Sequence, residues 1–364
     1  MARVLLAVAT ILAIACPAAA LPDQAALDDL AARVVEEKGV PAIGIAVSDG
    51  AGNVRVAVHG VRARGEETLV LPDDAWHIGS CTKAITSLLA ARMVDAGLIT
   101  WETTPGDVFA DLPPAANPQN VEAELIQLLS NTSGLSGPAT DMLAVTFGRA
   151  RQATGESTMS QRQSVARSIL CIAPIGEAGA QFDYANGGFI VAGAMLEAAA
   201  DEPLESLFDR FVFGPLGIET AGWGPPSAIS GHSRSGEALP ETDNPVAYDA
   251  AGRLHLSLAD WAKLCDVVLG RPNGFLSPES MSALTTPRTD GQPAYALGWI
   301  SIRTGTLGEI FTHAGTNTAW LAEAVVAPES SAVILVACSQ LNRQAVDAAR
   351  DGAAELLMAD RPAE

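Results

Sequence analysis

The sequence predicts an α+β fold, in which one antiparallel sheet flanked by helices is built from both ends of the chain. Strand-like apolar segments occur near the start of the sequence and again near its end. The middle of the chain instead alternates helix-like runs with Pro and Gly. Apolar residues make up 48% of the 364 residues, which is enough for a large buried core. We therefore expect a mainly helical domain inserted between the two parts of the sheet.

The N-terminal part is expected to contain a helix, a pair of strands and a second, strongly apolar helix. The corresponding residues are 24–38, 42–48, 54–59 and 82–96. Each helix is followed by a glycine, Gly39 or Gly97, which can adopt the left-handed conformation that often ends a helix. The two strands flank a turn rich in Gly, Asp and Asn at residues 49–53, a pattern typical of a hairpin.

The C-terminal part is expected to contain four consecutive strands and a closing helix. The corresponding residues are 295–303, 307–312, 321–326 and 333–338 for the strands, and 342–358 for the helix. These strands would join the first pair in one sheet. We expect a sheet lobe of about residues 24–98 and 270–364, and a helical lobe of about residues 99–269.

The first 20 residues have the pattern of a secretory signal peptide. A basic start at Arg3 precedes an apolar run at residues 4–15, and Ala18-Ala19-Ala20 offers a cleavage site. The run is too short to span a bilayer, and no later segment is long enough. We therefore expect residues 21–364 to be exported, to the periplasm or out of the cell. Lipoprotein anchoring through Cys16 is the alternative, although Ala13 matches the expected Leu poorly.

The charge of the chain excludes some classes of partner. The net charge is −20, and Lys and Arg together number 22 against 42 Asp and Glu. Contacts to phosphates need clustered cations, so we expect no nucleic acid partner. The chain also offers no basic patch for anionic lipid.

Neither a metal nor another cofactor is expected. The five histidines are scattered, without the His-x-His or His-Glu-x-x-His spacing of zinc sites. They are His59, His77, His232, His255 and His313. The cysteines after residue 20 lie in largely apolar contexts, which favours buried free thiols over a disulfide framework. They are Cys81, Cys171, Cys265 and Cys338.

The most informative motif is Ser80-Cys81-Thr82-Lys83. Only three of the 22 basic residues are lysines, and one of them follows a serine by one helical turn. A buried ammonium group can lose its proton, whereas a guanidinium cannot, so Lys83 can activate Ser80 for acyl transfer. The composition predicts about 0.2 chance matches to Ser-x-x-Lys, and the chain contains one.

A second motif is Tyr184-Ala185-Asn186. A phenol held near an ammonium group is stabilised as a phenolate and can relay a proton from Ser80. Asn186 can hydrogen-bond both Lys83 and a substrate carbonyl. The alternative is a buried tyrosine beside a turn-forming asparagine.

A third motif is His313-Ala314-Gly315, on one of the late strands. By itself this signal is weak, because His77-Ile78-Gly79 has the same form. Gly315 would let the backbone approach a substrate closely. The alternative is a histidine that is only hydrogen-bonded at a strand end.

Taken together, the three motifs resemble those of the penicillin-recognising serine hydrolases, the β-lactamase-related superfamily. The most similar branches are the class C β-lactamases, the related carboxylesterases and the D-amino-acid-specific peptidases. Further similar segments are residues 128–135, 184–197, 252–260 and 296–299, so the resemblance covers about residues 27–357. It implies a β-lactamase/transpeptidase-like fold, with the site in a cleft between the sheet and the helical domain.

The resemblance also implies roles for individual residues. Ser80 would form an acyl-enzyme, and Lys83 and Tyr184 would share the general-base role. The implied substrate-binding residues are Asn186, His313, Gly315 and Thr316. The backbone N–H groups of Ser80 and Thr316 are the implied oxyanion hole.

Three departures from the family pattern affect the expected substrate. His313 stands where class C β-lactamases have a Lys that faces the carboxylate of the drug. Asn131 replaces a usual His, which we interpret as a structural change. The segment from Thr316 to Trp320 replaces Gly-x-x-Pro-Gly, which places Trp320 near the expected pocket wall.

We therefore expect an exported serine hydrolase that acts on a small-molecule ester, amide or peptide. An esterase, or an amidase or peptidase for a D-amino-acid substrate, fits the departures best. A class C-like β-lactamase is one alternative. A penicillin-binding or sensing protein without catalysis is the other.

Overall fold

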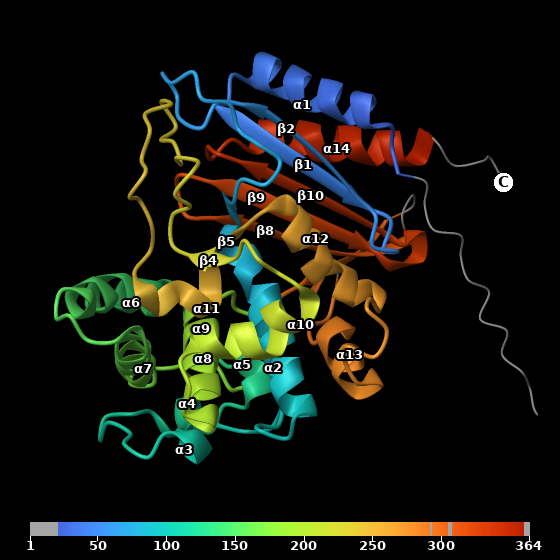
Figure 1. Ribbon diagram of the computed structural model, residues 1–364. Helices are drawn as coiled ribbons and strands as arrows, with labels where there is room; N and C mark the ends of the chain where they lie inside the picture. Colours follow the sequence, from blue (N-terminus) through green and yellow to red (C-terminus); the bar gives the residue numbers. More distant parts are fainter. Residues whose placement is uncertain (1–20, 292, 305–307, 360–364) are drawn as a thin grey trace, which may run out of the picture.

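The central element is a seven-stranded antiparallel sheet with the strand order β2-β1-β10-β9-β8-β7-β6 (Figure 1). The computed structural model describes residues 21–291, 293–304 and 308–359, so the expected signal peptide and Cys16 lie outside the described residues. The strands are β1 (Ala42–Ser48), β2 (Val54–Gly60), β6 (Ala294–Tyr295), β7 (Ile300–Thr304), β8 (Gly308–Thr316), β9 (Leu321–Ala327) and β10 (Ala332–Cys338). The sheet joins both ends of the chain, because β1 pairs with β10 and places Ile43 opposite Cys338.

Helices α1 (Gln24–Lys38) and α14 (Arg343–Ala359) lie side by side over one face of this sheet (Figure 1). The apolar residues of α1 recur at helical spacing, and Leu27, Leu30 and Val34 are buried on one side. The two helices pack closely, since a Cβ atom on Gly352 of α14 would lie 2.6 Å from Leu30 Cδ1. Helix α1 ends as predicted at Gly39, which has φ of 64°.

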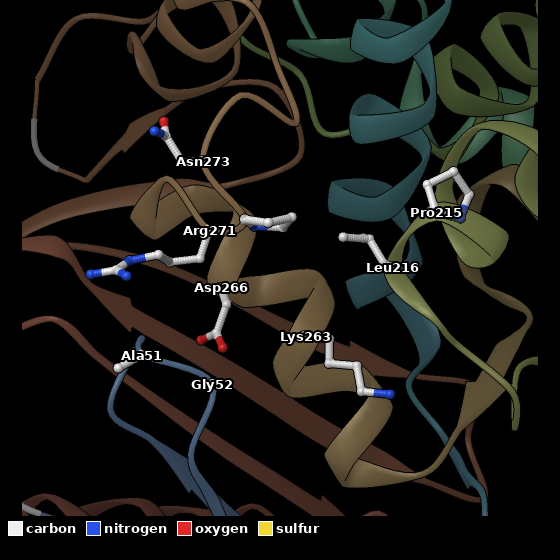
Figure 2. A pocket seen from close by; sticks show the side chains of 9 residues that line it. Ala51, Gly52, Pro215, Leu216, Lys263, Asp266, Arg271 and Asn273 are labelled. Carbon is white, nitrogen blue, oxygen red and sulfur yellow. The ribbon is translucent and has the colours of Figure 1, made fainter.

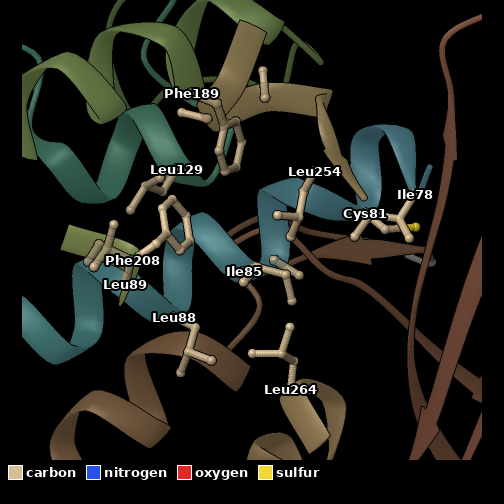
Figure 3. Close-up of a cluster of buried hydrophobic side chains, with 14 of the residues drawn as sticks. Ile78, Cys81, Ile85, Leu88, Leu89, Leu129, Phe189, Phe208, Leu254 and Leu264 are labelled. Carbon is tan, nitrogen blue, oxygen red and sulfur yellow. The ribbon is translucent and has the colours of Figure 1, made fainter. Parts of the chain in front are cut away.

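The opposite face of the sheet packs against the helical part of the protein, with α2 (Thr82–Asp95) in its centre. Helix α2 is apolar nearly all round, and it is buried on all sides over most of its length. In Figure 3, Ile85, Leu88 and Leu89 of α2 pack among side chains of other elements, including Phe189 and Phe208. This helix therefore holds its first turn in a fixed place at the sheet.

Most of the other helices surround α2 or extend away from the sheet, and α12 (Leu258–Asp266) packs against the sheet itself. They are α3 (Pro105–Val108), α4 (Pro118–Val121), α5 (Leu125–Leu129), α6 (Gly137–Gln152), α7 (Thr158–Ile169), α8 (Asn186–Ala200), α9 (Leu204–Phe208), α10 (Gly214–Leu216), α11 (Asp249–Gly252), α12 (Leu258–Asp266) and α13 (Pro278–Thr285). A small three-stranded sheet joins β3 (Trp76–His77), β5 (Leu254–Leu256) and β4 (Gly222–Trp223). Strand β3 thus connects the segment before α2 to the middle of the chain.

A buried ion-pair network ties the helical part together. The guanidinium group of Arg162 on α7 is 1% exposed and contacts three carboxylates, those of Glu197 on α8, Glu205 on α9 and Asp249 on α11. The Arg162 Nη2–Glu197 Oε1 distance is 2.6 Å. Burial raises the pKa of Glu197 to about 7, an effect that Arg162 opposes. Arg162 therefore supplies a positive charge that these three carboxylates share in the core of the helical part.

The predicted fold class is confirmed, and the differences are local. The single strand predicted at residues 295–303 is two strands, β6 and β7. Between them Gly298 has φ of 77°, and a Cβ atom there would lie 2.7 Å from Ala84 Cα in α2. The turn brings α2 and the sheet into backbone contact, which explains the interruption. Strand β8 also runs further than the predicted residues 307–312, to Thr316.

Several other expectations concern the whole chain. The division into two lobes stays a prediction, and α12, which the sequence places in the helical lobe, packs against β1 and β10. Among the described cysteines, Cys81, Cys265 and Cys338 are buried free thiols, and Cys171 is a half-buried one. Within the described residues, no helix has the length and apolar character needed to cross a membrane. The same part of the chain contains no cluster of His, Cys, Asp and Glu that could hold a metal ion.

Candidate active site

Ser80 lies in a short 3-10 turn, η1 (Gly79–Cys81), which leads directly into α2. Lys83 follows in the first turn of α2, and its Nζ atom lies 3.0 Å from Ser80 Oγ. Nζ also donates to Ala251 O at 2.7 Å. The side chain of Lys83 is 0% exposed, and this burial lowers its pKa to about 7, although the carboxylate of Asp141 acts in the opposite direction. A large fraction of Lys83 is therefore a neutral amine at neutral pH.

Asn186 begins α8 and links Lys83 to a residue that sequence reasoning missed. Its Oδ1 accepts a hydrogen bond from Lys83 Nζ at 2.6 Å, and its Nδ2 donates to Asp141 Oδ1 at 2.9 Å. Asp141 lies in α6, and Tyr248 O–H also donates to its Oδ1, at 3.3 Å. The four polar groups thus form one connected network beside Ser80.

Tyr184 precedes α8, and its ring centroid lies 5.0 Å from Lys83 Nζ. Although 37% of Tyr184 is exposed, burial of its hydroxyl side raises the pKa of the phenol, against the effect of a hydrogen bond with Ser80. Burial thus favours the neutral phenol over the expected phenolate near pH 7, whereas the lowered pKa of Lys83 makes its unprotonated form available there. Asn131 holds the Tyr184 loop, because it accepts hydrogen bonds from Ala185 N at 3.1 Å and Asp183 N at 2.9 Å.

His313 lies on β8 and is 3% exposed. Its ring packs beside Tyr184 and Tyr295, with centroids 6.0 and 6.3 Å away. Since a carbonyl only accepts, the 2.8 Å contact between Nδ1 and Ala314 O places the proton on Nδ1. No described residue hydrogen-bonds Nε2. Burial lowers the pKa of His313 to about 3, and the charge of Lys83 acts in the same direction, so the ring is neutral near pH 7.

Two glycines let β8 press directly against the turn that carries Ser80. A Cβ atom on Gly315 would lie 2.0 Å from Ile78 O and 2.5 Å from Ser80 N. A Cβ atom on Gly79, which has φ of 51°, would lie 2.3 Å from Thr316 N. Only glycine fits at both positions, and the contact brings the backbone N–H groups of Ser80 and Thr316 to the same part of the site.

A pocket of about 250 Å³ opens at this place. Of the predicted site residues, Ser80, Asn186 and Thr316 line it. The other lining residues are Asp141, Val145, Asn244, Tyr248, Ala251, Gly252, Asn317 and Thr318. Lys83 and Gly315 lie against lining residues, Lys83 beside Ser80 and Asn186 and Gly315 beside Ser80, whereas the His313 ring packs beside Tyr184 outside the lining.

Trp320 lies directly behind the pocket wall, since Thr316 Oγ1 donates to its backbone O at 2.6 Å. Trp320 is 1% exposed and packs edge-on against Trp76, with ring centroids 6.2 Å apart. The indole is therefore part of the core, and the residues just before it, Thr316 to Thr318, line the pocket. Nothing local in the sequence shows which way the indole turns.

A larger pocket of about 450 Å³ lies away from Ser80, between α10, α12 and the turn after β1 (Figure 2). Asp266 points into it, and its Oδ1 accepts a hydrogen bond from Ser48 Oγ at 2.8 Å. Burial raises the pKa of Asp266 to about 6. The described residues that line this pocket include no serine, threonine or cysteine, so its size does not make it the reaction site.

Comparison of the chain with known protein families and proteins identifies its family. The Beta-lactamase family model matches residues 27–358. The chain is 25% identical over 243 residues to the unguisins hydrolase of Aspergillus violaceofuscus. The aligned region covers 62% of this chain and 41% of that hydrolase. The chain thus spans about half, or less, of the length of the curated relatives that it matches.

Two solved structures show how widely the fold is shared. The octameric penicillin-binding protein homologue from Pyrococcus abyssi has a TM-score of 0.76 and 20% identity, covering 92% of this chain and 78% of that one. The D-amino acid amidase from Ochrobactrum anthropi SV3 has a TM-score of 0.75 and 17% identity, covering 93% and 100%. Because the family model spans nearly the whole described chain, the protein that carries this site belongs to the Beta-lactamase family of serine hydrolases.

Proposed function

We propose that the chain is a serine hydrolase that works through an acyl-enzyme on Ser80. One observation carries this proposal: the amine of Lys83 lies 3.0 Å from Ser80 Oγ, and burial lowers its pKa to about 7. A neutral amine at hydrogen-bond distance is a general base for a serine hydroxyl. No other described lysine lies within hydrogen-bond distance of a serine hydroxyl.

The reaction then follows in two halves. The Ser80 O–H proton passes to Lys83 Nζ while Oγ bonds to the substrate carbonyl carbon, whose oxygen becomes negative. The N–H groups of Ser80 and Thr316 stabilise that oxygen, and such donors each contribute about 3 kcal/mol. The bond to the leaving group breaks as the leaving group takes a proton from the Tyr184 phenol, which regains one from Lys83. A water molecule then attacks the acyl group with Lys83 as base, and Ser80 recovers its proton.

The substrate we propose is a small ester, or an amide or peptide of a D-amino acid. The pocket of about 250 Å³ favours a small acyl group. His313 is neutral near pH 7, so the site lacks the fixed cation expected for carboxylate-bearing β-lactams. Asn186 is proposed to orient the substrate carbonyl, and His313, Gly315 and Thr316 to shape the other side of the site.

Labelling of the nucleophile tests the mechanism. A fluorophosphonate probe should add to Ser80 alone, as located by peptide mass spectrometry, and Ser80→Ala should remain unlabelled. Ser233→Ala, which removes a hydroxyl that contacts Ser235 Oγ and Glu237 N and no described lysine, should label like wild type. An adduct on any other serine would remove the assignment of Ser80.

A substrate panel tests the reaction class. The panel contains p-nitrophenyl acetate and butyrate, nitrocefin and a D-amino-acid amide. We expect repeated turnover of the esters or the amide and weak turnover of nitrocefin. A single burst equal to the enzyme concentration, with no turnover, would instead identify a binding or sensing protein. Strong nitrocefin turnover would identify a β-lactamase.

We also propose that the protein is exported, on the basis of residues 1–20. Expression in a bacterial host followed by fractionation should place the protein in the periplasm or the medium. Intact mass should match a chain that begins near Leu21. A diacylglyceryl mass on Cys16 would identify the lipoprotein alternative, and a full-length cytoplasmic protein would contradict export.

A further inference from the structure

Asp141 is the one charged side chain among the described residues that line the pocket at Ser80. It lies in α6, one turn after the helix begins, and is half-buried. Its Oδ1 atom accepts hydrogen bonds from Asn186 Nδ2 at 2.9 Å and from Tyr248 O–H at 3.3 Å. No described residue donates a hydrogen bond to its Oδ2 atom or forms an ion pair with it. The carboxylate therefore has bonding capacity left for a ligand.

The carboxylate lies close to the place where the reaction would occur. Lys83 Nζ contacts Ser80 Oγ at 3.0 Å and Asn186 Oδ1 at 2.6 Å, and the other end of the same amide contacts Asp141. One side-chain amide thus separates the carboxylate from the ammonium or amine next to the nucleophile. A substrate bound to Ser80 would have atoms a few bonds from its carbonyl within reach of Asp141.

The other charges near the pocket do not offset Asp141. Asp243 lies behind the wall, where it accepts from Asn317 Nδ2 at 3.0 Å and pairs with Arg253 Nε at 3.3 Å. Arg253 also pairs with Asp249, so its charge is already shared between two carboxylates. Lys83 is held by three hydrogen bonds beneath Ser80. Just outside the lining, the exposed guanidinium group of Arg149 on α6 donates to Asp243 O at 3.2 Å. Among the described residues that line the pocket, the only charge is therefore negative, and none of them offers a cation to a substrate carboxylate.

We propose that Asp141 determines specificity by binding an ammonium group in the acyl part of the substrate. The substrates would be esters or amides of small amino acids with a free amino group, and N-acylated or carboxylate-bearing compounds would be rejected. This inference rests on the proposed acyl-enzyme at Ser80. A charge-assisted hydrogen bond between an ammonium and a carboxylate is stronger than a neutral one, and loss of the cation leaves the carboxylate to be desolvated without a partner.

A matched pair of substrates tests the proposal. D-alanine p-nitroanilide and its N-acetyl derivative differ in the charge of the amine and share the scissile bond. Wild type should prefer the free amine by at least about tenfold in kcat/KM. Asp141→Asn keeps an oxygen for Asn186 and should bring that ratio close to one. Glu355→Gln, which removes an exposed charge on α14 at the other face of the sheet, should leave the ratio unchanged.

The ratio separates specificity from positioning. If Asp141 only orients Asn186, the Asn variant loses activity on both substrates equally and the ratio stays as in wild type, which overturns the proposal. Measurable activity on the N-acetyl substrate shows that the variant is folded. A wild-type ratio near one would also overturn it.

The failure of this inference can be told apart from failure of the acyl-enzyme. If a fluorophosphonate labels Ser80 but wild type shows no preference, the acyl-enzyme stands and the role of Asp141 is wrong. If Ser80 is not labelled, the acyl-enzyme itself is wrong. Where neither anilide is hydrolysed, each is tested as a competitor of fluorophosphonate labelling at Ser80. The two concentrations that halve the labelling rate then replace the kcat/KM values in the comparison, and equal concentrations overturn the proposal.

Discussion

Substitution of Gly315 by alanine should remove most activity while leaving the protein folded. The added Cβ atom would lie 2.0 Å from Ile78 O, 2.5 Å from Ser80 N and 2.8 Å from Cys81 N. All three neighbours are backbone atoms of the turn that carries the nucleophile, so no side chain can rotate away. To restore ordinary contact near 3.4 Å, β8 and the turn must separate by more than about 1 Å.

The size of the effect follows from that displacement. The separation moves the N–H group of Thr316 away from that of Ser80, and these are the proposed oxyanion donors. A misplacement of about 1 Å costs roughly 10²-fold in rate, and loss of one oxyanion donor costs roughly 10²- to 10³-fold in kcat. Overpacking itself should lower the free energy of unfolding by about 1–3 kcal/mol. We expect kcat/KM to fall by about 10²- to 10³-fold.

The assay is hydrolysis of p-nitrophenyl butyrate, with urea unfolding as the measure of stability. Gly252→Ala is the matched control in the same site. A Cβ atom there would lie 3.6 Å from Gly79 C and 3.7 Å from Ser80 N, which is ordinary contact. That variant should keep activity within about threefold and an unchanged unfolding midpoint. If Gly315→Ala kept a third of wild-type activity, the close approach of β8 would not be what forms the oxyanion site.

The remaining predictions concern the base, the substrate class and the core. Because the base must be unprotonated, wild-type kcat/KM should rise with pH through about 7 and then level off. In Lys83→Arg, kcat should fall by at least ~10³-fold, and a variant that kept a tenth of wild-type activity would contradict the base role. Wild type should turn over nitrocefin weakly, and His313→Lys should raise the nitrocefin to p-nitrophenyl butyrate ratio about tenfold, with a smaller gain in high salt; an unchanged ratio would show that His313 does not set substrate class. Arg162→Met leaves Glu197 buried without its ion-pair partner and Asp249 with Arg253 alone, and should lower the free energy of unfolding by about 3–5 kcal/mol; an unchanged urea midpoint would show that Arg162 does not stabilise this buried network.

Most of the framework could be predicted because its signals are local. Helix α1 is predicted by apolar residues at helical spacing and α2 by a strongly apolar run, and the glycine after α1 does end that helix. The Ser80 to Lys83 spacing likewise places the two side chains one helical turn apart, from η1 to the first turn of α2, whatever surrounds them. The chemistry of lysine allows Lys83 to be neutral, but its lowered pKa is due to burial. That burial comes from the packing around α2, which the motif alone does not reveal.

The features that could not be predicted depend on contacts between segments that are distant in the sequence. Asp141 reaches Asn186 from 45 positions away in the sequence, and no spacing rule links the two. The strand around Gly298 is interrupted because α2 presses on it, a contact that its own sequence does not encode. Trp320 does lie next to the wall residue Thr316, but only the folded chain shows that its indole turns into the core against Trp76.

The pairing of β1 with β10 also has a consequence for the order in which the protein can be made. Strand β10 lies between β1 and β9, in the interior of the sheet, yet it is the last strand that the ribosome releases. Until it arrives, the hairpin of β1 and β2 has an unpaired edge, and α1 has no α14 beside it (Figure 1). Through most of translation the nascent chain therefore carries only the β1–β2 hairpin of this sheet, and β6 to β9 follow shortly before β10. A premature stop before residue 332 would remove the strand that joins them, so truncated products should be aggregation-prone fragments and not partial enzymes.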